Sequence, residues 1–119
     1  AVSLTGCGPT AGLDELTLDE IASANMSGTY TCVVETKTYN SDGSLKNSST
    51  SDPVEKSAAT VKLEMAGMAT TIGLVGTATS SAKGRVCANS KFTKIVIYVY
   101  TKDSDGRITA ESITTYKKI

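Results

Sequence analysis

The segment Ile95-Val96-Ile97-Tyr98-Val99-Tyr100 decides the fold, because all six of its side chains are apolar or aromatic. An unbroken run of β-branched and aromatic residues is typical of a strand in the interior of a sheet. Successive side chains of a strand point to opposite faces, so Val96, Tyr98 and Tyr100 share one face. We predict a strand over 92–102 whose two faces are both covered, or whose tyrosine face meets a ligand through Tyr98 and Tyr100.

Two turn signals connect strands into hairpins. Asp103-Ser104-Asp105-Gly106 ends the central strand, and Asn40-Ser41-Asp42-Gly43 follows an alternating segment over 29–39. The glycine at the end of each signal can take the left-handed conformation that hairpin loops use. We predict return strands over 107–116 and 44–50, the second of which is polar and belongs at a sheet edge.

The segment 58–65 alternates between apolar and polar residues more regularly than any other part of the chain. Alternation of this kind predicts a strand with one buried face. Ala66-Gly67 is expected to turn the chain into a further strand over 68–75, and a loop of small residues is expected over 77–84.

Thr17-Leu18-Asp19-Glu20 matches a capping box and predicts a short helix that ends near Asn25. Together these elements indicate an all-β fold, an antiparallel sandwich or small barrel of about six to eight strands with one short N-terminal helix. We assign residues 17–119 to this domain and residues 1–16 to a signal remnant and tether, or to an N-terminal arm.

Leu4-Thr5-Gly6-Cys7 places a branched apolar residue and two small residues before a cysteine. This pattern resembles the lipobox of bacterial lipoproteins, which precedes the cysteine that is lipidated when the signal peptide is removed. The resemblance implies that Cys7 carries a lipid anchor and that the domain lies on the outer side of a membrane. The alternative is a secreted protein with a genuine terminus at Ala1, in which Cys7 lies on an N-terminal arm.

The two other cysteines, Cys32 and Cys87, form an even pair once Cys7 is set aside. An exported chain meets an oxidising compartment, in which such a pair can bond. Closing a loop of this length stabilises a domain by about 4 kcal/mol in the chain-entropy description. We predict a Cys32–Cys87 disulfide, with two buried thiols in unrelated strands as the alternative.

Two further resemblances concern the first strand. Tyr30, two residues before Cys32, is similar to the tyrosine corner of immunoglobulin domains, although here it precedes the first cysteine of the pair. Gly28-Thr29-Tyr30 after a short helix resembles the start of a lipocalin, with tyrosine in place of tryptophan. The lipocalin resemblance implies a barrel that carries a small apolar ligand, in a cavity lined by Met65, Met68 and tyrosines.

Composition excludes several function classes. Twelve basic and twelve acidic side chains give a formal net charge of zero, which lacks the positive excess that nucleic-acid binding requires. The chain contains no histidine, which removes imidazole bases and Ser-His or Cys-His nucleophiles. Without histidine or closely spaced cysteines, the usual zinc sites are also excluded. We expect a protein without enzymatic activity, cofactor or metal.

These observations predict an exported, lipid-anchored, non-enzymatic binding domain of the cell envelope or surface, whose protein or glycan partner is unknown. A second hypothesis is a structural subunit of an extracellular filament. Ala1-Val2-Ser3-Leu4-Thr5 alternates well enough to add as a strand to a neighbour's sheet, so that the protein self-associates through residues 1–7. The lipocalin-like carrier is a third.

Overall fold

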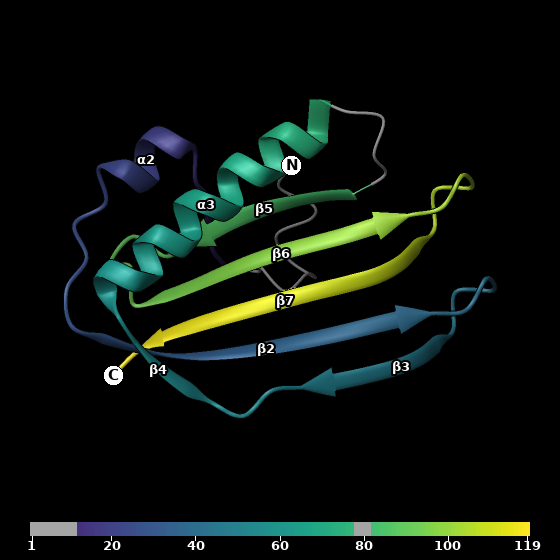
Figure 1. Ribbon diagram of the computed structural model, residues 1–119, viewed down its shortest axis with the longest axis horizontal. Coiled ribbons are helices and arrows are strands. Elements are labelled where there is room, and N and C mark those ends of the chain that lie inside the picture. Colours follow the sequence, from purple (N-terminus) through teal and green to yellow (C-terminus); the bar gives the residue numbers. More distant parts are fainter. Residues whose placement is uncertain (1–11, 78–81) are drawn as a thin grey trace.

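The computed structural model describes residues 12–77 and 82–119, and within them seven strands and two helices are formed (Figure 1). The strands are Asp14–Glu15 (β1), Thr29–Tyr39 (β2), Leu45–Thr50 (β3), Val54–Ser57 (β4), Ala82–Ala88 (β5), Lys94–Lys102 (β6) and Ile108–Lys118 (β7), and the helices are Leu18–Ala22 (α2) and Ala58–Thr77 (α3). All strands join one antiparallel sheet in the order β1-β5-β6-β7-β2-β3, and β4 pairs with β2 on the same side as β3. Both helices lie over one face of this sheet (Figure 1).

The predicted antiparallel, mostly β fold with a short N-terminal helix is confirmed. The capping box is formed as expected: the N–H of Glu20 donates to the Thr17 hydroxyl at 3.2 Å, and the N–H of Thr17 donates to the Glu20 carboxylate at 2.9 Å. The described sheet is open and not closed into a barrel. Helices, mainly α3, provide the layer that packs against it.

Both predicted hairpins are present. Gly43 and Gly106 have φ angles of 91° and 84°, the left-handed conformation that made glycine the expected residue at these turns. The two turns lie side by side at one end of the sheet, where the Arg107 guanidinium donates to the backbone carbonyl of Ser41 (Figure 1). Strand β3 is exposed at every residue, as expected for the polar edge.

The prediction of strands over 58–65 and 68–75, with a turn at Ala66-Gly67, is wrong, because these residues form the 20-residue helix α3. The apolar residues of 58–65 satisfy the helical period as well as the strand period. Ala58, Val61 and Met65 are buried, whereas Leu63 is 74% exposed, so the spacing of buried residues is three and four, as on one face of a helix.

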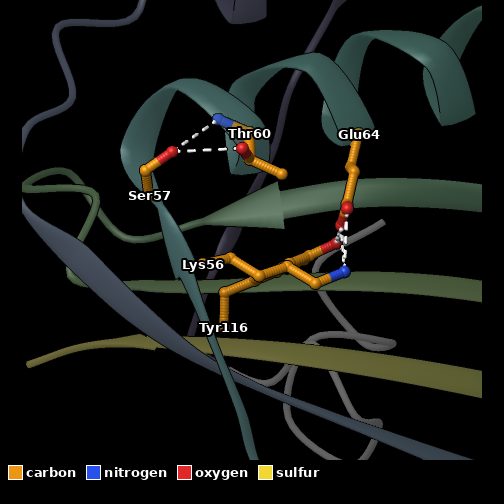
Figure 2. Close-up of polar contacts among 5 residues, drawn as sticks. All are labelled: Lys56, Ser57, Thr60, Glu64 and Tyr116. Carbon is orange, nitrogen blue, oxygen red and sulfur yellow. Dashed lines mark hydrogen bonds and ion pairs between the residues drawn. The ribbon is translucent and has the colours of Figure 1, made fainter.

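Local signals also favour the helix. The N–H of Thr60 donates to the Ser57 hydroxyl at 3.3 Å, so Ser57 satisfies one of the amides that a helix start leaves unpaired (Figure 2). Six of the first eight residues of α3 are alanine, lysine, leucine, glutamate or methionine, which are all good helix formers.

Some of the predicted tether belongs to the fold. Leu13 is 7% exposed, β1 pairs with β5, and the N–H of Leu16 donates to the carbonyl of Val86 at 2.8 Å. The folded unit therefore begins before residue 17. Strands β4 and β5 were also not expected from the sequence. The prediction of a small-residue loop over 77–84 is wrong at 82–84, which are the first residues of β5, and the rest of β5 carries no clear alternation.

The sheet has an apolar cluster on each face. The cluster under the helices contains Ile21, Tyr30, Cys32, Ala58, Val61, Met65, Val86, Ala88, Ile95, Ile97 and Tyr116. The cluster on the opposite face contains Leu13, Cys87, Val96, Tyr98 and Ile113. The central strand β6 contributes to both, which confirms the prediction that its two faces are covered.

Candidate functional site

A groove of about 390 Å³ lies between α3 and the helix-covered face of the sheet, and we call it the helix–sheet groove. It is lined by Cys32 and Val34 of β2, Lys56 of β4, Glu64, Gly67 and Met68 of α3, Ile97 of β6, and Thr114 and Tyr116 of β7. Its size is within the usual range for small-ligand sites, and most of its walls are apolar. Charged and hydroxyl-bearing side chains lie beside this apolar surface.

The polar part of the groove is formed by Lys56, Glu64 and Tyr116, which we call the polar corner (Figure 2). The Lys56 ammonium lies 3.0 Å from Oε1 and 2.8 Å from Oε2 of Glu64. The Tyr116 hydroxyl donates to Oε1 of the same carboxylate at 2.5 Å. The side chains of Lys56 and Glu64 are 28% and 35% exposed, so the ion pair borders both the groove and solvent.

The start of α3 sets this geometry. Lys56 is next to the capping residue Ser57, and Glu64 follows two helical turns later on the side of α3 that faces the sheet (Figure 2). Side chains four residues apart lie on one face of a helix, so Met68 extends the same wall of the groove beyond Glu64. Tyr116, 1% exposed, rises from the sheet below them.

The polar corner shifts the pKa of each of its members. Burial raises the pKa of Glu64, but hydrogen bonds from Lys56 and Tyr116 outweigh it and hold the pKa below its ordinary value. The hydrogen bond to Glu64 raises the pKa of Lys56. Burial, followed by the hydrogen bond to Glu64, raises the pKa of Tyr116. The corner is therefore a stable ion pair at neutral pH, with its tyrosine protonated.

Cys32 lies at the base of the groove as a buried thiol. Burial raises the pKa of the Cys32 thiol. The positive charge of Lys56 lowers it, but by less than burial raises it. Because the thiolate is the nucleophilic form, a thiol with a raised pKa is a poor nucleophile.

The predicted Cys32–Cys87 disulfide is wrong. Cys32 is on β2 and Cys87 on β5, with β7 and β6 between them. Adjacent strands are about 4.8 Å apart, so these positions are far beyond the reach of a disulfide. The two side chains also belong to the clusters on opposite faces of the sheet. The two cysteines are buried in different strands, as in the alternative interpretation.

Tyr98 and Tyr100 share one face of β6, as predicted, and it is the face opposite the helices. Tyr98 is 5% exposed, and its hydroxyl and that of Tyr39 both donate to the carboxylate of Glu111. Tyr100 is half-buried, with its ring centroid 5.2 Å from that of Tyr98 and 5.5 Å from the Lys102 ammonium. Tyr98 is thus a packed core residue, and of the two predicted ligand-binding tyrosines only Tyr100 retains an accessible surface.

Sequence reasoning singled out Met68 and the tyrosines as a group for a cavity, but it missed Lys56 and Glu64. The available signal was Ser57, a residue type favoured at helix N-caps, directly before Ala58 and Ala59, which are strong helix formers. The predicted lipidation site Cys7 lies outside the described residues. Within the described ranges, the side chains include no group of three or more potential metal ligands, and neither helix is long and apolar enough to cross a membrane.

Comparisons of the chain with protein-family models, with curated proteins and with solved structures find no match.

Proposed function

We propose that the protein is an exported, lipid-anchored, non-enzymatic binding domain that holds a small molecule in the helix–sheet groove. The observation that supports binding most directly is the groove itself, in which an apolar wall adjoins the polar corner. The lipobox-like Leu4-Thr5-Gly6-Cys7 supports export and anchoring.

The chemistry of the groove supports binding over catalysis. Its carboxylate, Glu64, is held ionised by Lys56 and Tyr116, and its thiol, Cys32, has a raised pKa. Neither group is poised near neutral pH, where an acid–base or nucleophilic catalyst would have to work.

Two measurements on material purified from its native membrane test this proposal. Intact-mass analysis should find a diacylglyceryl group on a chain that begins at Cys7, and an unmodified chain beginning at Ala1 would refute the anchor. Mass spectrometry of the protein under non-denaturing conditions should detect a small molecule that dissociates on unfolding. A ligand-free native protein would refute the binding of a small molecule in the helix–sheet groove.

A second candidate is the filament subunit, which is favoured by strand β3. This edge strand is six residues long and fully exposed, and it ends the strand order of the sheet. Its outer backbone groups are therefore placed to pair with an added strand such as residues 1–5 of a neighbour. High-mass assemblies that disappear when residues 1–5 are deleted would favour this candidate over the anchored binder.

A further inference from the structure

We propose that the molecule bound in the helix–sheet groove is an uncharged amphiphile, with a hydroxyl head at the polar corner and an apolar body along Val34, Met68 and Ile97. This inference names the ligand class and rests on the proposed function of the groove as a binding site.

The charge of the polar corner argues for an uncharged head. Lys56 and Glu64 are in contact with each other at 2.8 Å, and their formal charges cancel. A carboxylate on the ligand would face Glu64, and an ammonium would face Lys56, with no unpaired counter-charge among the lining residues. Moving either ion from water into the groove would lose hydration without a new partner.

The remaining hydrogen-bond capacity of the corner fits a hydroxyl. A carboxylate has about four acceptor positions, and Glu64 uses three of them, two at Oε1 and one at Oε2. Lys56 has three N–H groups and directs two toward Glu64. The ion pair thus retains one acceptor position on Glu64 and one donor on Lys56. A hydroxyl group donates one bond and accepts another, so it satisfies both together.

The apolar part of the groove leaves room for the body of the ligand. Gly67 lies on the groove side of α3, and a Cβ added there would meet no heavy atom within 4 Å outside its own stretch of helix. A glycine inside a helix costs about 1 kcal/mol relative to alanine, and here it leaves open the space next to Met68.

The test compares three probes that share one tail: 1-octanol, octanoate and octylammonium. Each is titrated into the full chain at pH 7, and the backbone amide resonances of Val34, Gly67 and Thr114 are followed by NMR. We expect octanol to shift these resonances and to bind about tenfold more tightly than either ion, a difference of about 1.4 kcal/mol.

Two charge variants change the predicted preference in opposite directions. In Lys56→Met the Glu64 carboxylate loses its counter-ion, so octylammonium should become the tightest of the three probes. In Glu64→Gln the Lys56 ammonium loses its counter-ion, so octanoate should become the tightest. A variant that merely disturbed the fold would weaken all three probes alike, which separates recognition from damage.

A groove-filling variant locates the site. Gly67→Leu replaces glycine with a strong helix former and projects an apolar side chain into the groove, so it should weaken octanol binding at least tenfold without loss of helicity. Ala59→Leu adds the same side chain at an exposed position at the start of α3 and should leave octanol binding unchanged.

The outcomes distinguish the two levels of the proposal. If octanoate or octylammonium binds the unaltered protein more tightly than octanol, the ligand class is wrong, while the groove remains a binding site. If none of the probes shifts the groove resonances, or if Gly67→Leu binds octanol as well as the unaltered chain does, the groove assignment itself is overturned. Neither result bears on the lipid anchor, which the intact mass tests separately.

Discussion

The two faces of the sheet contain the same small motif in different surroundings. On each face a glutamate accepts hydrogen bonds from tyrosine hydroxyls: Glu64 from Tyr116 under the helix, and Glu111 from Tyr39 and Tyr98 on the opposite face. Only Glu64 is also paired with a lysine, Lys56. The glutamate–tyrosine contact alone therefore does not mark a binding site, because around Glu111 the same contact is largely buried in the core. The features that distinguish Glu64 are the adjoining groove and the lysine counter-ion.

The largest test of this comparison removes a tyrosine ring from each face. Tyr116→Ala and Tyr98→Ala should each lower the free energy of unfolding by about 3–5 kcal/mol, as for other large buried aromatic residues, because both side chains are almost fully buried. Urea denaturation measures both values. A cost below about 1 kcal/mol for Tyr98→Ala would mean that the face opposite the helices is not a second core.

Removing only the hydroxyl groups sharpens the comparison. Tyr98→Phe should cost about 2 kcal/mol, because Glu111 is left with the neutral donor Tyr39 alone. Tyr116→Phe should cost about 1 kcal/mol, because Lys56 still neutralises Glu64. Chemical denaturation of the two variants under identical conditions gives the ranking. The reverse ranking would show that the lysine does not support Glu64.

The groove predicts a substitution that stabilises. Gly67→Ala should raise the free energy of unfolding by up to about 1 kcal/mol, since alanine is the better helix former and its methyl group meets open space. The matched control Ala59→Gly, at an exposed site near the start of the same helix, should lower it by a similar or smaller amount. Thermal and urea unfolding measure both, and a destabilised Gly67→Ala would indicate that the groove is filled.

The smallest expected effects are in the pH dependence of stability. The pKa of Glu64 is lowered in the folded protein, so its contribution to stability is complete above about pH 4.3, the ordinary glutamate pKa, and is lost as the pH falls through the folded value. The pKa of Tyr39 is raised to about 12, mainly by its hydrogen bond to Glu111, so its contribution is complete below about pH 10 and is lost toward pH 12.

Unfolding free energies measured across pH test both signs. Glu64→Gln should flatten the acid limb. Tyr39→Phe should remove the contribution of Tyr39 to the alkaline limb and leave the acid limb in place. If the unfolding free energy of Glu64→Gln falls at low pH as steeply as that of the unaltered protein, other carboxylates cause the acid sensitivity.

The hairpins were predictable because their signals are local. Gly43 and Gly106 each fix a turn within four residues, and the run from Ile95 to Tyr100 permits little except a covered strand. The segment 58–65 was ambiguous because its apolar residues fit periods of both 2 and 3.6. In the predicted strand over 58–65, Glu64 belongs to the polar, outward side of a sheet. That placement gives no reason to expect it near Tyr116.

The incorrect strand prediction over 58–65 is also the reason that the candidate site was not predicted. Lys56, Glu64 and Tyr116 belong to a short strand, a helix and the last strand, and no spacing along the chain relates them. The predicted disulfide failed for a related reason. Cysteine count and compartment say nothing about which face of a sheet a residue occupies, and Cys32 and Cys87 occupy different ones.

The pairing of β2 with β7 has a consequence for how the polypeptide matures. Strand β2, the first long strand, pairs on its inner side with β7, the last strand. The centre of the sheet therefore forms between residues that are separated by most of the described chain. Contacts between such distant residues form late, after the local hairpins. A chain that is still being synthesised therefore cannot complete the centre of this sheet until β7 is available to pair with β2.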